Sequence, residues 1–363
     1  MNPNRGQPTP IPPVLGLFQK RIDGDDTLLE LAKRCFKKAG LGIECYAGTA
    51  DELDHVLGFK PWPETPAVAH LARAINIMTN EGRDIVLDVA ARFRKDLFGL
   101  VLHDQPELCS SFHDYVTALR RLADGLQEMT HPPALYVEYA SGLPVDRFIR
   151  LFDAIEDLEE ISCGIDIGHV GLWQVRRAFS FRHPGVDVCT LQPRDPALPD
   201  LIGEVQKAVK SATSAVIQVV KALGRHGKPI HFHLHDGHPI AAVNPLGISD
   251  HLAFSEKIPI PFLYKGKHDL DPMFGPFGLE KILEAALTQP GPERVSFTLE
   301  IHPTGRTRPL GPYDELFSHW KDKTNAKKMF HWLCMLVENH RLVMKLLHNQ
   351  MPTHLKGSHH ETA

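Results

Sequence analysis

The sequence predicts an α/β fold of the (β/α)8 type, a TIM barrel with a C-terminal helical extension. Short apolar, strand-like runs alternate with amphipathic helical segments, and acidic residues and histidines stand at the ends of several of these runs. The chain has 363 residues, of which 43% are hydrophobic, and this suffices to bury one large core. Polar residues at successive strand ends indicate an active site at one end of such a barrel.

The first elements already alternate between strand and helix. Residues 1–13 are polar and proline-rich and are expected to form a tail, and the apolar run 14–18 is expected to begin the barrel. A capping box that opens at Thr27 predicts an amphipathic helix ending at Gly40. Residues 41–46 form the next predicted strand, so the chain opens in a β, α, β order that favours a parallel sheet.

The remaining elements continue this pattern. In order, they are two helices within 65–98, a strand at 99–103, a helix at 112–129, a strand at 134–138, a helix at 145–159, a strand at 161–167, a helix at 200–225, a strand at 229–235, a helix at 277–288 and a strand at 294–301. Seven strands are thus predicted. The eighth, which would close the barrel, is expected at 84–89 or near 186–191.

Two connections are longer than ordinary βα loops, at 168–198 and 236–275. Long loops at the catalytic end of a barrel favour an enclosed substrate pocket. The barrel is expected to span 14–305. A helical extension is expected over 306–350, where apolar residues recur at helical spacing, and 351–363 is expected to be a disordered tail.

The charge balance disfavours several classes of partner and environment. The net charge is −4, so no general positive field is available to attract nucleic acid. No apolar run is long enough to span a bilayer and no secretory signal is recognised, so we expect no membrane partner and a cytoplasmic location. The six cysteines show no CxxC spacing and are expected to be reduced.

Four polar side chains near strand ends predict a divalent metal site. Glu138, Asp166 and Glu300 lie at or near the ends of three predicted strands, and His233 lies near the end of a fourth. Because side chains alternate between the two faces of a strand, all four can point into the barrel mouth. Three carboxylates at one point repel one another unless a cation lies between them, and an imidazole is a suitable fourth ligand.

Each of these segments also has a simpler interpretation. A single glutamate after a strand is commonly an ion-pair partner, and Asp166 with His169 can be a helix-capping aspartate beside a partly buried histidine. His231 is interpreted as a hydrogen-bonded residue of the barrel mouth. His302 is interpreted as a structural residue or one that supports a ligand, because the next residue is a proline that ends the strand. The four positions taken together favour the metal site.

The order and spacing of these signatures over residues 14–303 resemble the xylose isomerase-like barrel superfamily, which contains sugar isomerases and epimerases as well as endonuclease IV. The resemblance implies that the metal ligands are Glu138, Asp166, His233 and Glu300. The family's Asp-x-x-His pair corresponds to Asp166 and His169, and its His-apolar-x-Asp segment to residues 233–236. Tyr139 departs from the family, which usually has an asparagine after the glutamate.

The endonuclease branch of this superfamily implies further metal ligands. His103 and His268 resemble two of its additional zinc-binding histidines. A histidine expected on the preceding strand is not found in the predicted elements, and Gly266 replaces an expected aspartate. One metal ion, or two at most, is therefore expected rather than three.

For the isomerase branch, the resemblance implies a manganese, cobalt or magnesium ion that stabilises an enediolate while a proton leaves carbon. Glu138 and Glu300 would act as acid and base. His169 would be a further catalytic residue that orients substrate hydroxyls. The expected substrate-binding residues are His235, Asp236 and Lys267, and an anionic group could contact Lys265, Lys267 and Arg306 or Arg308.

Three hypotheses follow from the sequence. The first is a divalent-metal-dependent isomerase or epimerase of a sugar or polyol-like hydroxy-ketone. The second is a multinuclear zinc or iron enzyme, either a phosphoester hydrolase or an oxygen-dependent enzyme, and both hypotheses imply a small-molecule substrate. The third is a catalytically inactive barrel that acts as an interaction protein. A homodimer is one option, because the apolar C-terminal positions can pack on the same barrel or on a second subunit.

Overall fold

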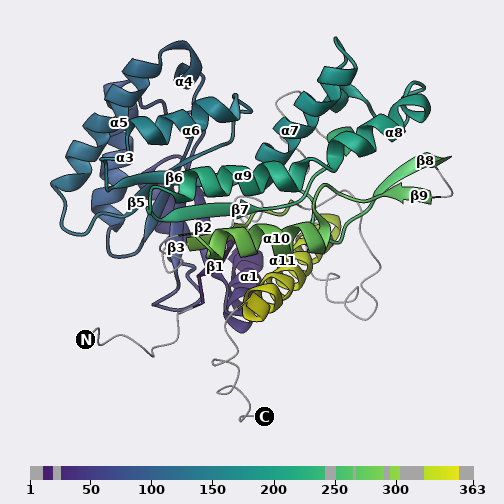
Figure 1. Ribbon diagram of the computed structural model, residues 1–363. Helices are drawn as coiled ribbons and strands as arrows, with labels where there is room; N and C mark the ends of the chain where they lie inside the picture. The colour runs from purple at the N-terminus through teal and green to yellow at the C-terminus, as the bar shows by residue number, and fades with distance from the viewer. Residues whose placement is uncertain are drawn as a thin grey trace, which may run out of the picture.

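The centre of the computed structural model is a closed barrel (Figure 1). The structure describes residues 11–18, 26–241, 251–264, 267–289, 295–302 and 323–350. Within these ranges, eight parallel strands close in the order β1-β10-β7-β6-β5-β4-β3-β2. The strands are β1 (Val14–Phe18), β2 (Gly42–Ala47), β3 (Ala67–Leu71), β4 (Gly99–His103), β5 (Ala134–Glu138), β6 (Ile161–Asp166), β7 (Ile230–Leu234) and β10 (Val295–Leu299). The predicted (β/α)8 fold class is confirmed.

Helices surround this barrel. They are α1 (Asp26–Ala39), α2 (Ala50–Leu57), α3 (Asn80–Phe93), α4 (Glu107–Ser110), α5 (Phe112–Gln127), α6 (Val145–Ala154), α7 (Ile167–Arg182), α8 (Leu198–Val209), α9 (Ala212–Gly224), α10 (Gly275–Leu287) and α11 (Lys323–Gln350). Two 3-10 turns, η1 (Val188–Thr190) and η2 (Pro239–Ala241), and an antiparallel hairpin of β8 (Ile258–Tyr264) and β9 (Lys267–Leu270) complete the described elements. In Figure 1 the hairpin extends away from the barrel on the same side as α8.

Alternation along the strands gives the barrel interior two layers. Leu15, Val68, Val101 and Tyr136 form a small buried apolar cluster inside the barrel, which we call the interior floor. Two residues later on β3, β4 and β5 the same face carries polar side chains, because every second side chain of a strand points to the same side. A polar layer therefore lies directly beyond the interior floor, towards the carboxyl ends of the strands.

The eighth strand lies at Ala67–Leu71, so both expected locations were wrong. Residues 84–89 belong to α3, and the segment near 186–191 contains η1. All five residues of β3 are buried, so its sequence shows no alternation of polar and apolar residues. Three of the five are alanine or leucine, which favour helices, and the segment was therefore assigned to a helix.

Two further expectations need correction. The expected loop at 168–198 begins with α7, because the Asp166 side chain accepts a hydrogen bond from the backbone N–H of His169 and caps the helix directly after β6. The single helix predicted at 200–225 is divided into α8 and α9. Ser211 lies at this break, where its hydroxyl donates to the Ala208 carbonyl.

The C-terminal helical extension is confirmed over α11, which runs along α1 and α10 (Figure 1). Trp332 is buried, and its indole N–H donates to the Ile301 carbonyl at 2.6 Å. The Asn339 side chain accepts from the backbone N–H of Phe254 at 3.2 Å. The helix therefore fixes the segment after β10 and the loop after β7. Residues 1–10, 306–322 and 351–363 lie outside the described residues.

Two expectations from composition are also addressed. All six cysteines lie in the described part of the chain, and none of them forms a disulfide there. Among the helices described, none combines the length and the apolar character that crossing a membrane requires.

Candidate metal centre

Histidines and carboxylates form five overlapping groups among the described residues, three of which we call clusters. The other two are Glu44 with His70 and His233, and His251 with Glu300 and His302. In each cluster, every residue offers one potential ligand atom, and these atoms lie within 4.8 Å of one another. The first cluster is His70, His103 and Glu138; the central cluster is Glu138, Asp166, His233 and Glu300; the outer cluster is Asp166, His169, His235 and His251. Glu138 and Asp166 each belong to two clusters, so the three form one continuous polar centre.

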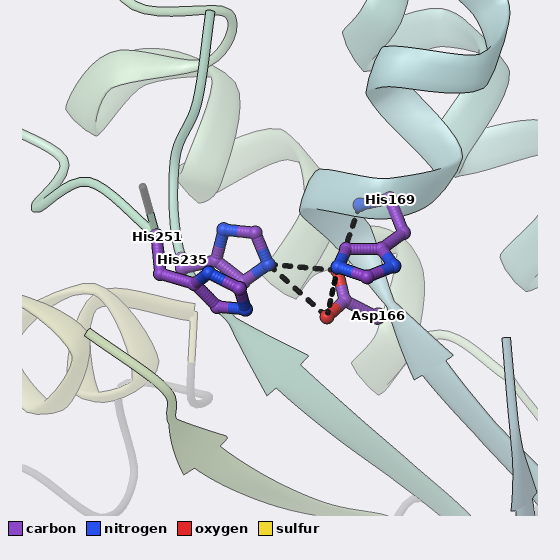
Figure 2. Close-up of side chains that lie close together, drawn as sticks. All are labelled: Asp166, His169, His235 and His251. Carbon is purple, nitrogen blue, oxygen red and sulfur yellow. Dashed lines mark hydrogen bonds and ion pairs between the residues drawn. The ribbon is translucent and has the colours of Figure 1, made fainter. Parts of the chain in front are cut away.

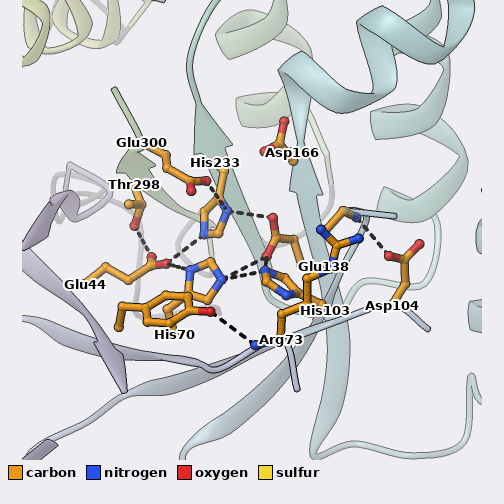
Figure 3. Close-up of polar contacts among 12 residues, drawn as sticks. Glu44, His70, Arg73, His103, Asp104, Glu138, Asp166, His233, Thr298 and Glu300 are labelled. Atoms are coloured by element: carbon orange, nitrogen blue, oxygen red, sulfur yellow. Dashed lines mark hydrogen bonds and ion pairs between the residues drawn. The ribbon is translucent and has the colours of Figure 1, made fainter. Parts of the chain in front are cut away.

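The central cluster brings together the four residues that the sequence suggested as metal ligands (Figure 3). His233 Nδ1 lies 3.0 Å from Glu138 Oε1 and 3.1 Å from Glu300 Oε2. Glu138 and His233 are almost completely buried, whereas the Glu300 side chain is 13% exposed. Glu300 is therefore the carboxylate of this cluster that a molecule entering the barrel mouth reaches first.

The first cluster contains a histidine that sequence reasoning missed. His70 lies on β3, and its Nε2 lies 2.8 Å from Nε2 of His103, which ends β4. Glu138 Oε2 lies 3.5 Å from His70 Nε2 and 3.4 Å from His103 Nε2. His70 supplies the histidine that was expected on the strand before His103 and not found, because this strand had been read as helix.

The outer cluster lies at the start of α7 (Figure 2). His169 directs Nδ1 to the Ala140 carbonyl at 2.9 Å, so Nδ1 donates and a lone pair remains on Nε2. Both oxygens of Asp166 contact His235 Nε2, at 2.9 and 3.1 Å. Glycine at position 168 permits this packing, because a Cβ there would lie 1.9 Å from the ring of His235.

His251 joins the outer cluster from the loop after β7. Its ring centroid lies 4.1 Å from that of His235 and 3.8 Å from that of His302, with which it stacks. Its Nε2 lies 3.6 Å from Glu300 Oε1, and His302 Nε2 lies 3.9 Å from the same oxygen. No pattern in the sequence indicated His251, because a long connection brings it to the site. The histidine stack links Glu300 to the outer cluster.

Two buried polar atoms that lack a hydrogen bond indicate that these residues fit a metal ion. Glu138 Oε2 and His169 Nε2 are buried, and neither has a hydrogen-bond partner among the described residues. A buried polar atom without a partner costs about 1–3 kcal/mol, and a cation at this point would remove that cost. In His169 the other ring nitrogen is bound by a carbonyl, which is the arrangement found in metal-binding histidines.

The electrostatics of the centre favour ionised carboxylates. Burial opposes ionisation of Glu138, but the neighbouring His233 and His103 lower its pKa to about 2. Burial likewise opposes ionisation of Asp166, yet His169 and His235 lower its pKa. Burial lowers the pKa of His103 to about 4 and so keeps its ring neutral, as metal binding requires.

The rings of His70, His233 and His235 differ from that of His103, because neighbouring carboxylates raise the pKa of all three despite burial. At His235 the nearby Asp166 carboxylate raises the pKa to about 9. A metal ion that binds His235 must therefore displace a proton at neutral pH.

Asp236, suggested by the sequence as a substrate-binding residue, follows β7. The Asp236 carboxylate accepts from the backbone N–H groups of Gly237, Phe274 and Gly275, so its oxygens are engaged in fixing the loop after β7 and the start of α10. The side chains of Lys267 and His268, on β9, lie outside the described part of the structure, as do residues 265, 266, 306 and 308. The hydroxyl of Tyr139, the residue after Glu138, donates to the Leu143 carbonyl at 2.5 Å.

A further buried acid, Glu44 on β2, was not recognised as a site residue from the sequence. It is completely buried beneath the first and central clusters (Figure 3). Its nearest partners are His70, His231, His233 and Thr298. Glu44 lies in the middle of a predicted strand, on the same face as Gly42 and Tyr46. An acid at such a position was the signal that could have identified it.

Comparisons with known proteins found only distant structural likenesses. The chain matches no protein-family model and no curated protein. Solved structures that it resembles include a mandelate oxidase variant, at 12% identity and TM-score 0.36 over 92% of this chain and 74% of that one. The carboxyl transferase domain of Rhizobium etli pyruvate carboxylase matches at 15% identity and TM-score 0.39, over 92% of this chain but half of that one. A xylanase from Cellvibrio japonicus matches at 11% identity and TM-score 0.42, over 81% and 87%. At these TM-scores the likenesses carry no argument about activity, and the barrel is assigned from its own strand order.

Proposed function

We propose that this protein is a metal-dependent enzyme with at least two metal positions that share Glu138. The observation that carries the proposal is the placement of the two Glu138 oxygens. Oε1 faces His233 at 3.0 Å, whereas Oε2 faces His70 and His103 at 3.5 and 3.4 Å. A carboxylate placed in this way can bridge two ions, and bridged pairs in enzymes lie about 3.5–4 Å apart.

The donor set favours zinc or iron at these positions. The first cluster offers two imidazoles for one carboxylate, and imidazole suits zinc and iron better than it suits magnesium. His70 and His103 with Glu138 would hold one ion, and Asp166, His233 and Glu300 with Glu138 would hold the other. Bound there, the ions would polarise a substrate oxygen and activate a water molecule at neutral pH.

We propose hydrolysis of a small phosphate ester as the reaction. Paired metal positions are typical of enzymes that displace a group at phosphorus. Glu300 is the exposed carboxylate of the central cluster, so it is placed to orient the attacking water and to accept its proton. With a net charge of −4 the chain has no general attraction for duplex DNA, so the substrate is proposed to be a small molecule.

Isomerisation of a hydroxy-ketone is the second candidate, and the assembly of Glu138, Asp166, His233 and Glu300 supports it. In that mechanism one ion occupies the central cluster, and Glu138 and Glu300 exchange protons with the substrate. The position of Glu138 makes this the less favoured reaction. Its side chain is only 3% exposed, against 13% for Glu300, which leaves Glu300 as the more accessible acid or base.

Metal content and activity together test the proposal. Elemental analysis of the wild-type chain should give at least two zinc or iron ions, and His103→Ala should lose one of them. The rates at which His103→Ala hydrolyses p-nitrophenyl phosphate and bis(p-nitrophenyl) phosphate should fall together with its metal content. A single manganese, cobalt or magnesium ion that is indifferent to His103→Ala would favour the isomerase. Iron with substrate-dependent oxygen uptake would instead identify an oxygen-dependent enzyme.

A further inference from the structure

We propose that Glu44 is a positioning residue that orients one histidine for each of two metal positions and thereby couples the binding of the two ions. The inference rests on the proposed function, because it concerns the first and central clusters. Glu44 belongs to neither cluster. It lies beneath both of them on β2 and is completely buried.

One oxygen of Glu44 serves both histidines. Its Oε1 accepts a hydrogen bond from His70 Nδ1 at 2.7 Å and lies 2.9 Å from His233 Nε2. The second contact is an ion pair rather than an aligned hydrogen bond, because His233 Nε2 makes no hydrogen bond among the described residues. A single carboxylate oxygen thus lies between rings that come from β3 and β7 (Figure 3).

The opposite nitrogen of each ring points to a different cluster. His70 Nε2 faces His103 and Glu138 in the first cluster. His233 Nδ1 faces Glu138 and Glu300 in the central cluster. A carboxylate on one imidazole nitrogen fixes the ring orientation and leaves the other nitrogen to bind metal with greater basicity. Glu44 would therefore assign Nε2 of His70 and Nδ1 of His233 as the ligand atoms.

The other oxygen of Glu44 is held by residues outside the three clusters. Oε2 accepts from Thr298 Oγ1 at 2.5 Å and from His231 Nε2 at 2.9 Å. His231 is itself fixed, because its Nδ1 lies 2.7 Å from the Ser296 hydroxyl. Two neighbouring strands, β7 and β10, thus hold the carboxylate in one orientation. Any displacement of Oε1 would change the orientation of both metal-binding rings at the same time.

Direct metal binding by Glu44 is the alternative role, since Glu44, His70 and His233 also have atoms close enough to hold an ion. Two observations favour the positioning role. Both oxygens of Glu44 are already engaged by protein groups, and the free sides of both rings point towards the other clusters. An ion on Glu44 would compete with these contacts in a fully buried place.

Glu44→Gln tests the coupling with little change in shape. The amide keeps one oxygen and replaces the other with an NH2 group, which donates and cannot accept from a ring N–H. The metal-free chain is titrated with zinc in competition with a chelator, and bound zinc is counted. The variant should bind the ions of the first and central clusters about 10- to 100-fold more weakly, in a single step for both. Zinc bound through His169 should be unchanged, as a comparison with His169→Ala reveals.

Matched variants separate this role from a general loss of packing. Thr298→Val removes one hydrogen bond to Glu44 but keeps the carboxylate, so its zinc affinity should fall less than that of Glu44→Gln. Glu44→Asp keeps the charge on a shorter side chain and should restore part of the affinity. Thermal unfolding of each metal-free variant checks that the chain is folded. If Glu44→Gln does not fold, the zinc affinity of Glu44→Asp is compared with that of the wild-type chain instead.

The outcomes distinguish this inference from the proposed function. If the wild-type chain binds two ions and Glu44→Gln binds them with equal affinity, the positioning role is overturned and the proposed function stands. A crystal structure of the zinc-loaded chain with an ion on Glu44 would also overturn it. If the wild-type chain binds no zinc or iron, the proposed function fails, and this inference fails with it.

Discussion

The interior floor and the polar layer beyond it lie on the same strands, only two residues apart, and have opposite properties. Val68 precedes His70 on β3, and Tyr136 precedes Glu138 on β5. The floor is apolar and fully packed, so it stabilises the barrel without any ligand. The polar layer contains buried charges and unpaired atoms, which cost free energy unless a cation is present. Positions two residues apart on one strand thus have different roles: the first stabilises the fold, and the second contributes to the candidate metal centre.

Breaking the polar layer at its shared residue should have the largest effect. Glu138→Gln removes the negative charge from both the first and central clusters. We expect catalytic activity to fall by more than about 100-fold. Loss of a metal ligand lowers activity more than a change in a residue that only hydrogen-bonds to a ligand. The variant should remain folded, since the interior floor is untouched. Steady-state kinetics and elemental analysis provide the measurement, and normal activity with normal metal content would contradict the account.

Damage to the interior floor should have the opposite consequences. Leu15 is completely buried in this layer, and Leu15→Ala should lower the free energy of unfolding by about 2–5 kcal/mol. The number of metal ions per chain should not change. Urea unfolding of the metal-free protein measures the effect, with Phe181→Ala as control. The Phe181 side chain is 88% exposed, so its loss should change stability by less than about 0.5 kcal/mol. Equal effects of the two variants would be inconsistent with the floor's role.

Removing metal should destabilise the protein through the polar layer alone. An ion present at 100 times its dissociation constant stabilises the folded state by about 2.7 kcal/mol. We therefore expect the melting temperature to fall when zinc is replaced by excess chelator. The same comparison in Glu138→Gln should show a smaller difference, because its sites bind metal poorly. A melting temperature that zinc does not affect would count against metal binding by the folded chain.

The pH dependence of metal binding should show whether His235 is a ligand in the outer cluster. Asp166 raises the pKa of His235 to about 9 despite burial, so below that pH an ion must displace a proton from this ring. The affinity of the outer cluster for the ion should rise about tenfold per pH unit between pH 7 and 9, and it should level off above pH 9. Cobalt absorption in the wild-type chain, minus that in His169→Ala, isolates this cluster. A flat profile over this range would show that His235 is not a ligand.

The sequence was sufficient for most of the barrel and for the central cluster. Seven strands and the residues Glu138, Asp166, His233 and Glu300 were found because polar residues mark the ends of apolar runs. β3 was missed because a strand buried on both faces, rich in alanine and leucine, has no period of two. His70 was lost with it, so only His103 and Glu138 of the first cluster were recognised from the sequence.

Long-range packing explains the other omissions. His251 has a positive φ of 45° and reaches the site through a loop, so no local pattern reveals it. The role of Glu44 depends on partners from β3, β7 and β10, which lie far from it in sequence. Expectations for Asp236 assumed that an acid at a strand end faces the substrate. Its carboxylate instead accepts hydrogen bonds from backbone amides on both sides of the loop.

The central claim is that Glu138 bridges two ions, and the distance between those ions tests it most directly. X-ray absorption at the zinc or iron edge of the purified, active protein measures this distance without a crystal. The account predicts a metal–metal separation of about 3.5–4 Å that disappears in Glu138→Gln. A spectrum of the wild-type chain with a single ion and no metal neighbour would contradict it.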